Sequence, residues 1–293
     1  MRLQANGIGI EVDDHGPANG EPLLLVMGLG MQLVAWPDEL VGDLVSRGFR
    51  VIRLDNRDAG LSDGFDHAGV PNLAWAGMRY AMHLPVKSPY GIADMAADTL
   101  GVIDALGLSR VHLCGASMGG MISQHLAAKH PGRVKSLTLM MTTSGARHLP
   151  QPSARVRMAL LSRPDGRDRG AIVRHLERVL SIIGSPGYPP DPQALRRRLE
   201  TSVARAWRPA GTARQLAAVM ADGDRSPLLA SITAPTRVIH GQEDPLIPVA
   251  SAHDLAAKIR GAVLERVPGM GHDLPGALLP GFAKSIAENA ARV

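Results

Sequence analysis

Hydrophobic residues follow two alternating patterns along the chain, and this alternation predicts the order of secondary structure. Short continuous apolar runs, such as Pro22–Met27 and Val111–Cys114, are typical of strands buried on both faces. Apolar residues at helical spacing, as in Ile92–Leu106 and Met118–Lys129, separate such runs. Repeated strand–helix units of this kind predict an α/β protein with a mainly parallel sheet.

The same patterns continue over most of the chain. Ile8, Ile10 and Val12 alternate behind Asn6-Gly7, a pair that favours a tight hairpin turn. We predict further strands at 50–54, 134–141, 236–240 and 262–267, and helices at 36–47 and 274–290. With the hairpin, this gives an eight-stranded sheet flanked by helices.

One long stretch lacks strand patterns. Helical patterns such as Ala171–Ile183 and Pro192–Ala206 are separated there by breaks that contain proline and glycine. We therefore expect two units. The core domain comprises residues 1–144 and 227–293, and a helical lid of residues 145–226 is inserted between strands 6 and 7.

Composition excludes several function classes. No stretch approaches the roughly 20 apolar residues of a membrane span, and the N-terminus has no apolar signal segment, so we expect a cytoplasmic protein with no membrane partner. The net charge is +5, but the basic residues are scattered and aromatic residues make up 3%, so nucleic acid is not an expected partner. The single cysteine, Cys114, lies in a predicted strand and is not expected to be catalytic.

A serine stands between an apolar strand and a helix. Gly115-Ala-Ser117-Met-Gly119 matches G-x-S-x-G, in which glycines let strand and helix pack closely around a tight turn. In a chain with 32 glycines the pattern alone is weak, but the flanking strand and helix supply the context that it requires. We therefore expect Ser117 to be a nucleophile.

A serine nucleophile needs a general base within reach and a third group that orients the base. Asp244 and His272 each follow one of the last two predicted strands, so both lie beyond the carboxyl ends of parallel strands, where ligands bind in open sheets. We predict a catalytic triad of Ser117, Asp244 and His272. Glu243 remains the alternative acid.

Attack on a carbonyl creates an oxyanion, which preorganised backbone N–H groups stabilise. Met118, at the start of its helix, is one expected donor. The glycine-flanked loop after the third strand supplies the second, for which we expect the Leu29 N–H, with Gly28 as the alternative. The chemistry implies no cofactor and no metal.

Substrate contacts are expected in the cover segments. Gly28, Trp75 and Met78 are the candidates, because a methionine-rich segment at 72–82 suits a bulky apolar substrate, although plain packing explains it equally well. Residues 145–226 are rich in arginine. These side chains either form a solvated outer face, which we expect, or face an acidic substrate.

These residues resemble the α/β-hydrolase superfamily over nearly the whole chain outside 145–226. Six segments are similar to its bacterial esterase branch, which includes aclacinomycin methylesterase: Val26–Gly30, Trp36–Glu39, Asp55–Asp58, Gly60–Ser62, Asp94–Ala96 and Gly271–Pro275. The resemblance implies the α/β-hydrolase fold, assigns the triad roles to Ser117, Asp244 and His272, and implies a carboxylic ester substrate, such as a methyl ester on a polycyclic compound.

Two positions depart from the wider superfamily. Met27 replaces the usual histidine before the oxyanion loop, which leaves the main-chain donor intact. Asp58 stands where many relatives carry glycine, and we expect its side chain to anchor the loop by a hydrogen bond.

We expect hydrolysis of a small apolar ester through an acyl-enzyme. Two alternatives remain open. The same triad can serve C–C bond hydrolysis or cofactor-free perhydrolase or haloperoxidase chemistry, and a noncatalytic small-ligand binding protein can share the fold. Epoxide and haloalkane hydrolysis are disfavoured, because those reactions use an aspartate where this chain has Ser117.

Overall fold

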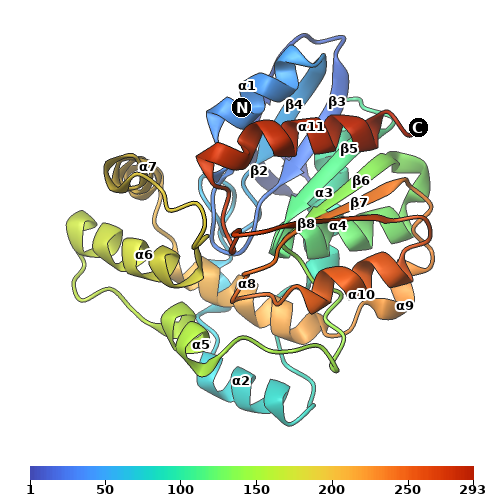
Figure 1. Ribbon diagram of the computed structural model, residues 1–293. Coiled ribbons are helices and arrows are strands. Elements are labelled where there is room, and N and C mark those ends of the chain that lie inside the picture. Colours follow the sequence, from blue (N-terminus) through green and yellow to red (C-terminus); the bar gives the residue numbers. More distant parts are fainter.

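The computed structural model describes all 293 residues, as a twisted sheet with helices on both faces and a further group of helices beside it (Figure 1). Eight strands form one sheet in the order β1-β2-β4-β3-β5-β6-β7-β8. β1 pairs with β2 and β2 with β4 in antiparallel fashion, and all other pairs are parallel. The strands are β1 (Arg2–Ala5), β2 (Ile8–His15), β3 (Glu21–Val26), β4 (Phe49–Leu54), β5 (Val111–Ala116), β6 (Val134–Met140), β7 (Thr236–Gly241) and β8 (Val263–Val267). The predicted eight-stranded, mostly parallel sheet is confirmed.

Helices cover both faces of the sheet. One face carries α1 (Asp38–Ser46) and α11 (Leu279–Ala290), and the other carries α3 (Ile92–Ala105), α4 (Met118–Lys129) and α10 (Ala250–Lys258). Each layer of helices closes its own hydrophobic cluster against the sheet. This burial on both faces explains why the central strands are continuous apolar runs.

Between β6 and β7 the chain forms only helices, in the range 145–226 that we call the insertion. They are α5 (Ala154–Leu161), α6 (Arg169–Ile183), α7 (Pro192–Arg205), α8 (Pro209–Asp222) and α9 (Ser226–Leu229). Figure 1 shows α5, α6 and α7 standing away from the sheet. α6 and α7 pack on each other through a small apolar cluster of their own.

The remaining helix, α2 (Leu73–Ala81), follows β4 and packs against α8. The Asn72 side chain caps it by accepting the N–H of Trp75 at 3.0 Å. Four short 3₁₀ helices complete the chain: η1 (Leu33–Ala35), η2 (Asp66–Ala68), η3 (Pro131–Arg133) and η4 (Gly276–Leu278). No helix is both long and apolar enough to cross a membrane.

Local sequence explains where elements turn or begin. Asn6 and Gly7 adopt positive φ angles of 51° and 78°, as the predicted hairpin turn requires. The last helix begins at Leu279 rather than at the predicted residue 274, because Pro275 and Gly276 precede it in an extended and then a 3₁₀ conformation. Pro280 then occupies the first turn, which tolerates proline.

Candidate active site

Ser117 occupies the sharp turn between β5 and α4. Its φ of 55° and ψ of −120° lie in a region that residues other than glycine rarely adopt, so the turn is strained. A Cβ on Gly115 would lie 2.3 Å from the carbonyl oxygen of Gly119, and a Cβ on Gly119 would lie 2.0 Å from that of Val26. Only glycine therefore fits on either side of the serine, and the turn lifts its hydroxyl out of the sheet.

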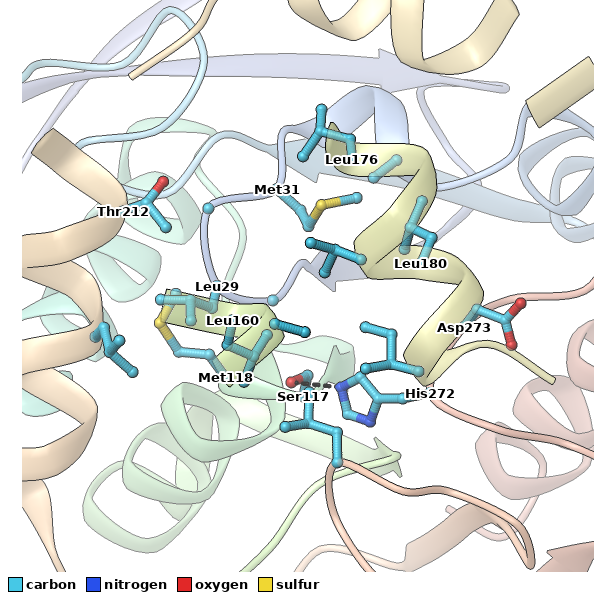
Figure 2. A pocket seen from close by; sticks show the side chains of 18 of the residues that line it. Leu29, Met31, Ser117, Met118, Leu160, Leu176, Leu180, Thr212, His272 and Asp273 are labelled. Carbon is cyan, nitrogen blue, oxygen red and sulfur yellow. Dashed lines mark hydrogen bonds between the residues drawn. The ribbon is translucent and has the colours of Figure 1, made fainter. Parts of the chain in front are cut away.

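Loops after β7 and β8 bring two side chains to Ser117. The Nε2 atom of His272 lies 3.0 Å from Ser117 Oγ (Figure 2), and its Nδ1 lies 2.7 Å from Oδ2 of Asp244. The other carboxylate considered, Glu243, is exposed and accepts the N–H of Gly269 at 2.6 Å. The structure thus brings together Ser117, His272 and Asp244 and leaves Glu243 outside.

The surroundings of Asp244 keep it ionised. Its Oδ1 accepts the N–H groups of Leu246 at 2.9 Å and Ile247 at 2.8 Å. Burial alone would raise the pKa of Asp244, but electrostatic attraction and hydrogen bonds from His272 and His240 hold that pKa well below its usual range. An ionised Asp244 accepts the Nδ1 proton of His272, so the Nε2 lone pair faces the serine hydroxyl.

The loop that carries His272 is attached to the end of α6. The backbone N–H of His272 donates to the carbonyl oxygen of Ile183 at 2.7 Å, and that of Gly271 donates to Ser185 Oγ at 2.8 Å. Ser185 in turn donates its hydroxyl proton to Asp273. Ser185 could not be predicted from the sequence, because an isolated serine after a helix has no distinctive pattern. The insertion therefore helps to hold the histidine.

The predicted oxyanion donors lie beside the serine. A Cβ on Gly28 would lie 3.0 Å from Ser117 Cβ, so the loop after β3 passes very close to the turn. Met118 is the first residue of α4, where a backbone N–H has no acceptor within the helix. The Leu29 N–H, outside any regular element, donates to no atom of the protein. Both donors are thus available to an oxygen atom bound in front of Ser117.

A cavity of about 2320 Å³ lies in front of Ser117 and His272. Figure 2 shows its walls near the serine, where Leu160, Leu176, Leu180 and Thr212 come from the insertion and Leu29 and Met31 from the loop after β3. This volume exceeds the roughly 300–1,000 Å³ of ordinary ligand pockets. The walls around the serine are mainly apolar, so the site suits a bulky apolar molecule.

Comparison with known proteins identifies the family. The family model of the alpha/beta hydrolase fold matches residues 21–275. The chain belongs to the α/β-hydrolase fold family. Rhodomycin D methylesterase DauP of Streptomyces sp. strain C5 is 31% identical over 98% of this chain and 94% of its own length. This relative confirms the resemblance to the bacterial methylesterase branch.

Two further comparisons define the range of similar proteins. A 2-hydroxy-6-oxononadienedioate/2-hydroxy-6-oxononatrienedioate hydrolase of Paraburkholderia xenovorans is 27% identical over 90% of this chain and 84% of its own. The solved structure of an enol-lactonase from Burkholderia xenovorans has a TM-score of 0.74 at 24% identity, covering 99% of this chain and all of that one. The structural likeness shows that this α/β hydrolase has the same fold as the enol-lactonase.

A buried glutamine of α8 fixes the loop after β3, which carries the predicted oxyanion donor, in this α/β hydrolase. Gln215 Oε1 accepts the N–H of Gly30 at 2.7 Å, and its Nε2 donates to the carbonyl oxygen of Arg57 at 2.7 Å. Asn56 adds a bond to the carbonyl oxygen of Met27 at 2.8 Å. The sequence did not point to Gln215, because its partners are far away along the chain. The only signal is one amide among the apolar residues of α8.

A buried ion pair joins α8 to the loop after β4. Arg214 binds Asp58 in bidentate fashion, with Nε–Oδ2 and Nη2–Oδ1 distances of 2.8 and 2.7 Å. Asp58 also accepts the Tyr90 hydroxyl at 2.7 Å and the Phe65 N–H at 2.8 Å. Its φ of 67° is the left-handed conformation that glycine adopts readily. Asp58 therefore anchors both its own loop and α8.

The arginines of the insertion serve several purposes. Arg205, Arg214 and Arg225 form ion pairs in the interior, with Asp55, Asp58 and Asp222 respectively. Four others border the cavity: Arg163, Arg167, Arg198 and Arg208. The expectation that the arginines form a solvated outer face therefore holds for only some of them.

Trp75 and Met78 lie outside the cavity, contrary to the expectation that they contact substrate. Their side chains are 54% and 44% exposed, and neither belongs to the cavity wall. The opposite face of α2, with Ala76, is the buried one, and Tyr80 reaches the cavity instead. A stripe of large apolar residues at helical spacing does not say which side of the helix packs inward. Gly28 does line the cavity.

Proposed function

We propose that the protein hydrolyses carboxylic esters of bulky apolar molecules through a Ser117–His272–Asp244 triad. The observation that carries the proposal is the 3.0 Å contact between Ser117 Oγ and His272 Nε2 at the wall of a large, mainly apolar cavity. The similarity to a methylesterase over nearly the full length of both chains supports an ester as the bond that is cleaved.

The first half of the reaction forms an acyl-enzyme. His272 Nε2 accepts the hydroxyl proton of Ser117 as Oγ attacks the ester carbonyl carbon, and the carbonyl electrons move to oxygen. The N–H groups of Leu29 and Met118 stabilise this oxyanion. When the tetrahedral intermediate collapses, the C–O bond to the alcohol breaks and His272 gives its proton to the leaving oxygen. Asp244 stabilises the imidazolium while it carries the charge.

The second half releases the acid. A water molecule enters beside His272, which accepts a proton as the water oxygen attacks the acyl carbon. The same two backbone donors hold the second oxyanion. Collapse expels Ser117 Oγ, which recovers its proton from His272. One ester and one water thus give one acid and one alcohol, and the enzyme returns to its starting state.

We further propose that residues 145–226 act as a lid over a core of residues 1–144 and 227–293. The support is that α5, α6, α7 and α8 all contribute side chains to the cavity wall in front of Ser117. A roof of this kind excludes water from the reacting atoms and shapes the space for the substrate.

A second candidate is hydrolysis of a C–C bond by the same three side chains. The similarity to a hydrolase of 2-hydroxy-6-oxononadienedioate favours it, at lower identity than that to the methylesterase. Both candidates require the same nucleophile, so only the substrate distinguishes them.

The test is turnover of p-nitrophenyl and methyl esters of increasing bulk, beside a vinylogous 1,5-diketone, by the wild-type protein and Ser117→Ala. The proposal predicts ester cleavage with release of equal amounts of acid and alcohol, abolished in the variant. Cleavage of the diketone without ester turnover would favour the second candidate, and ester turnover retained by Ser117→Ala would contradict the mechanism.

A further inference from the structure

Two segments near the cavity carry large apolar side chains on their outer surfaces. In α2 and the turn after it, Trp75, Met78 and Met82 follow at helical spacing and are 54%, 44% and 60% exposed. In α5, Met158 and Leu161 are 71% and 54% exposed. Single exposed apolar side chains are ordinary, but a whole helix stripe turned to solvent indicates a contact surface.

The turn after α2 is exposed throughout. Five consecutive residues, 81–85, are all exposed, and they include Met82 and Leu84 at 60% and 43%. Only one hydrogen bond to a side chain supports the turn, from Arg79 Nε to the carbonyl oxygen of Pro85 at 2.7 Å. We call the exposed side chains of residues 75–87 and 155–163 the apolar–basic rim.

The charge of the rim has one sign. Residues 67–93 and 145–164 contain no aspartate or glutamate, but they carry six cations: Lys87, Arg155, Arg157 and Arg163 in the rim, the half-buried Arg79, and Arg147 outside the bounds of the rim. The nearest acids along the chain are engaged elsewhere: Asp66 with Arg214, Asp94 with the backbone N–H of Gly91, and Asp165 with Arg178. None of the six cations forms an ion pair in the structure. The rim therefore offers apolar side chains together with uncompensated positive charge.

Both segments also border the cavity. Asn72, Leu73 and Tyr80 of the α2 segment and Leu160 and Leu161 of α5 contribute to its wall. Figure 1 shows α2 and α5 at the same end of the molecule, away from the sheet. A surface that meets the rim would therefore meet the protein beside the cavity that holds Ser117.

We propose that the apolar–basic rim docks on an anionic lipid surface. Exposed Trp, Met and Leu side chains insert at the boundary between headgroups and acyl chains, while Lys and Arg attract anionic headgroups. A second copy of this chain fits less well, because a two-fold contact would place the same uncompensated cations opposite one another. Such docking would deliver an ester dissolved in lipid to the cavity, and this use of the docking rests on the proposed function. The docking itself does not.

Vesicle flotation tests the proposal. Wild-type protein is mixed with vesicles of phosphatidylcholine alone or with about 30% phosphatidylglycerol, at low and high salt. The expected result is flotation with the anionic vesicles, at least about fivefold less with the neutral ones, and loss of binding as salt rises. No flotation with anionic vesicles, or equal binding to both kinds, overturns the proposal.

Paired variants locate the contact. Met82→Ser with Leu84→Ser removes the apolar tip, and Arg155→Gln with Arg157→Gln removes two cations; each pair should lower the bound fraction severalfold. The control, Arg196→Gln with Arg197→Gln, removes two exposed cations of α7 and should bind like wild type. A control that loses as much binding as the rim variants would contradict the assignment of the contact to the rim.

Activity and oligomeric state separate the remaining outcomes. Turnover of a short, water-soluble p-nitrophenyl ester should be unchanged in every variant, because none of the altered residues lines the cavity. An inactive protein that still floats would contradict the proposed function and leave the docking intact. A wild-type dimer in sedimentation that Met82→Ser with Leu84→Ser abolishes would assign the surface to self-association and overturn the proposal.

Discussion

Gln215 of the insertion holds Gly30 of the oxyanion loop, through a 2.7 Å hydrogen bond between two groups that are 185 residues apart in the chain. Gln215 is fully buried, and its amide also binds the carbonyl oxygen of Arg57. Leu29, whose N–H we assign to the oxyanion, is the residue before Gly30. A helix that lines the cavity therefore also sets the position of the proposed oxyanion donor.

Replacement of Gln215 by leucine should impair catalysis more than binding. Without the acceptor for the Gly30 N–H, the Leu29 donor loses its fixed position, and we expect kcat to fall about tenfold with little change in KM, because the donor acts on the transition state. Steady-state kinetics with a p-nitrophenyl ester measure both constants. Gln124→Leu is the matched control, since Gln124 is equally buried but binds Thr143 and Arg225 instead. An equal fall in kcat in both variants would assign the effect to general destabilisation.

Asp244→Asn should be far more damaging than Glu243→Gln. An asparagine amide donates to His272 Nδ1, which moves the imidazole proton to Nε2, so the ring can no longer accept the Ser117 proton. Loss of a triad carboxylate by such a change lowers kcat by about 10⁴-fold. Glu243→Gln keeps an oxygen for the Gly269 N–H and should stay within about twofold of wild type. If Glu243→Gln were the more harmful change, the acid of the triad would be wrongly assigned.

The pH dependence of stability should report the Asp58–Arg214 pair. Burial would raise the pKa of Asp58, but the hydrogen bonds of Arg214, Tyr90 and Phe65 lower it below its usual value. Since the folded pKa lies below the unfolded value of about 3.9, this stabilisation is present above that pH and is lost as the pH falls below it. Asparagine tolerates the left-handed backbone at this position. Asp58→Asn should therefore remove only the charge that pairs with Arg214, and should lower the free energy of unfolding by about 3 kcal/mol at neutral pH.

Urea unfolding of wild type and Asp58→Asn across the acid range measures this difference. We expect it to shrink steadily below about pH 4, because the wild-type carboxylate then becomes protonated and the two proteins become alike. A difference that stays constant down to the acid unfolding limit would mean that the charge of Asp58 does not contribute to stability.

The sheet and the three central side chains could be predicted because their signals are local. Buried strands are short apolar runs, and Ser117 lies in a five-residue pattern whose glycines are required by contacts of 2.0–2.3 Å. The placement of Asp244 and His272 beside Ser117 follows from their positions after the last two strands. Each of these inferences needs only a few neighbouring residues and the rule that parallel strands end at one edge of the sheet.

The insertion could be predicted only in outline, because its contacts are not local. Gln215, Arg214 and Ser185 bind residues of distant loops, and nothing in their own segments indicates those partners. The expectation that Trp75 and Met78 contact substrate is wrong for a related reason. Trp75 and Met78 form an apolar stripe, but only the packing of Ala76 on the opposite face shows which side points inward.

If Ser117 is the activated nucleophile, a fluorophosphonate probe should form a phosphonate ester with its Oγ atom and release fluoride. We expect one adduct per chain by intact-mass measurement, mapped to the peptide that contains Ser117, with no labelling of Ser117→Ala and strongly slowed labelling of His272→Ala. An adduct on any other residue, or no adduct on a folded wild-type protein, would contradict the assignment of Ser117 as the nucleophile.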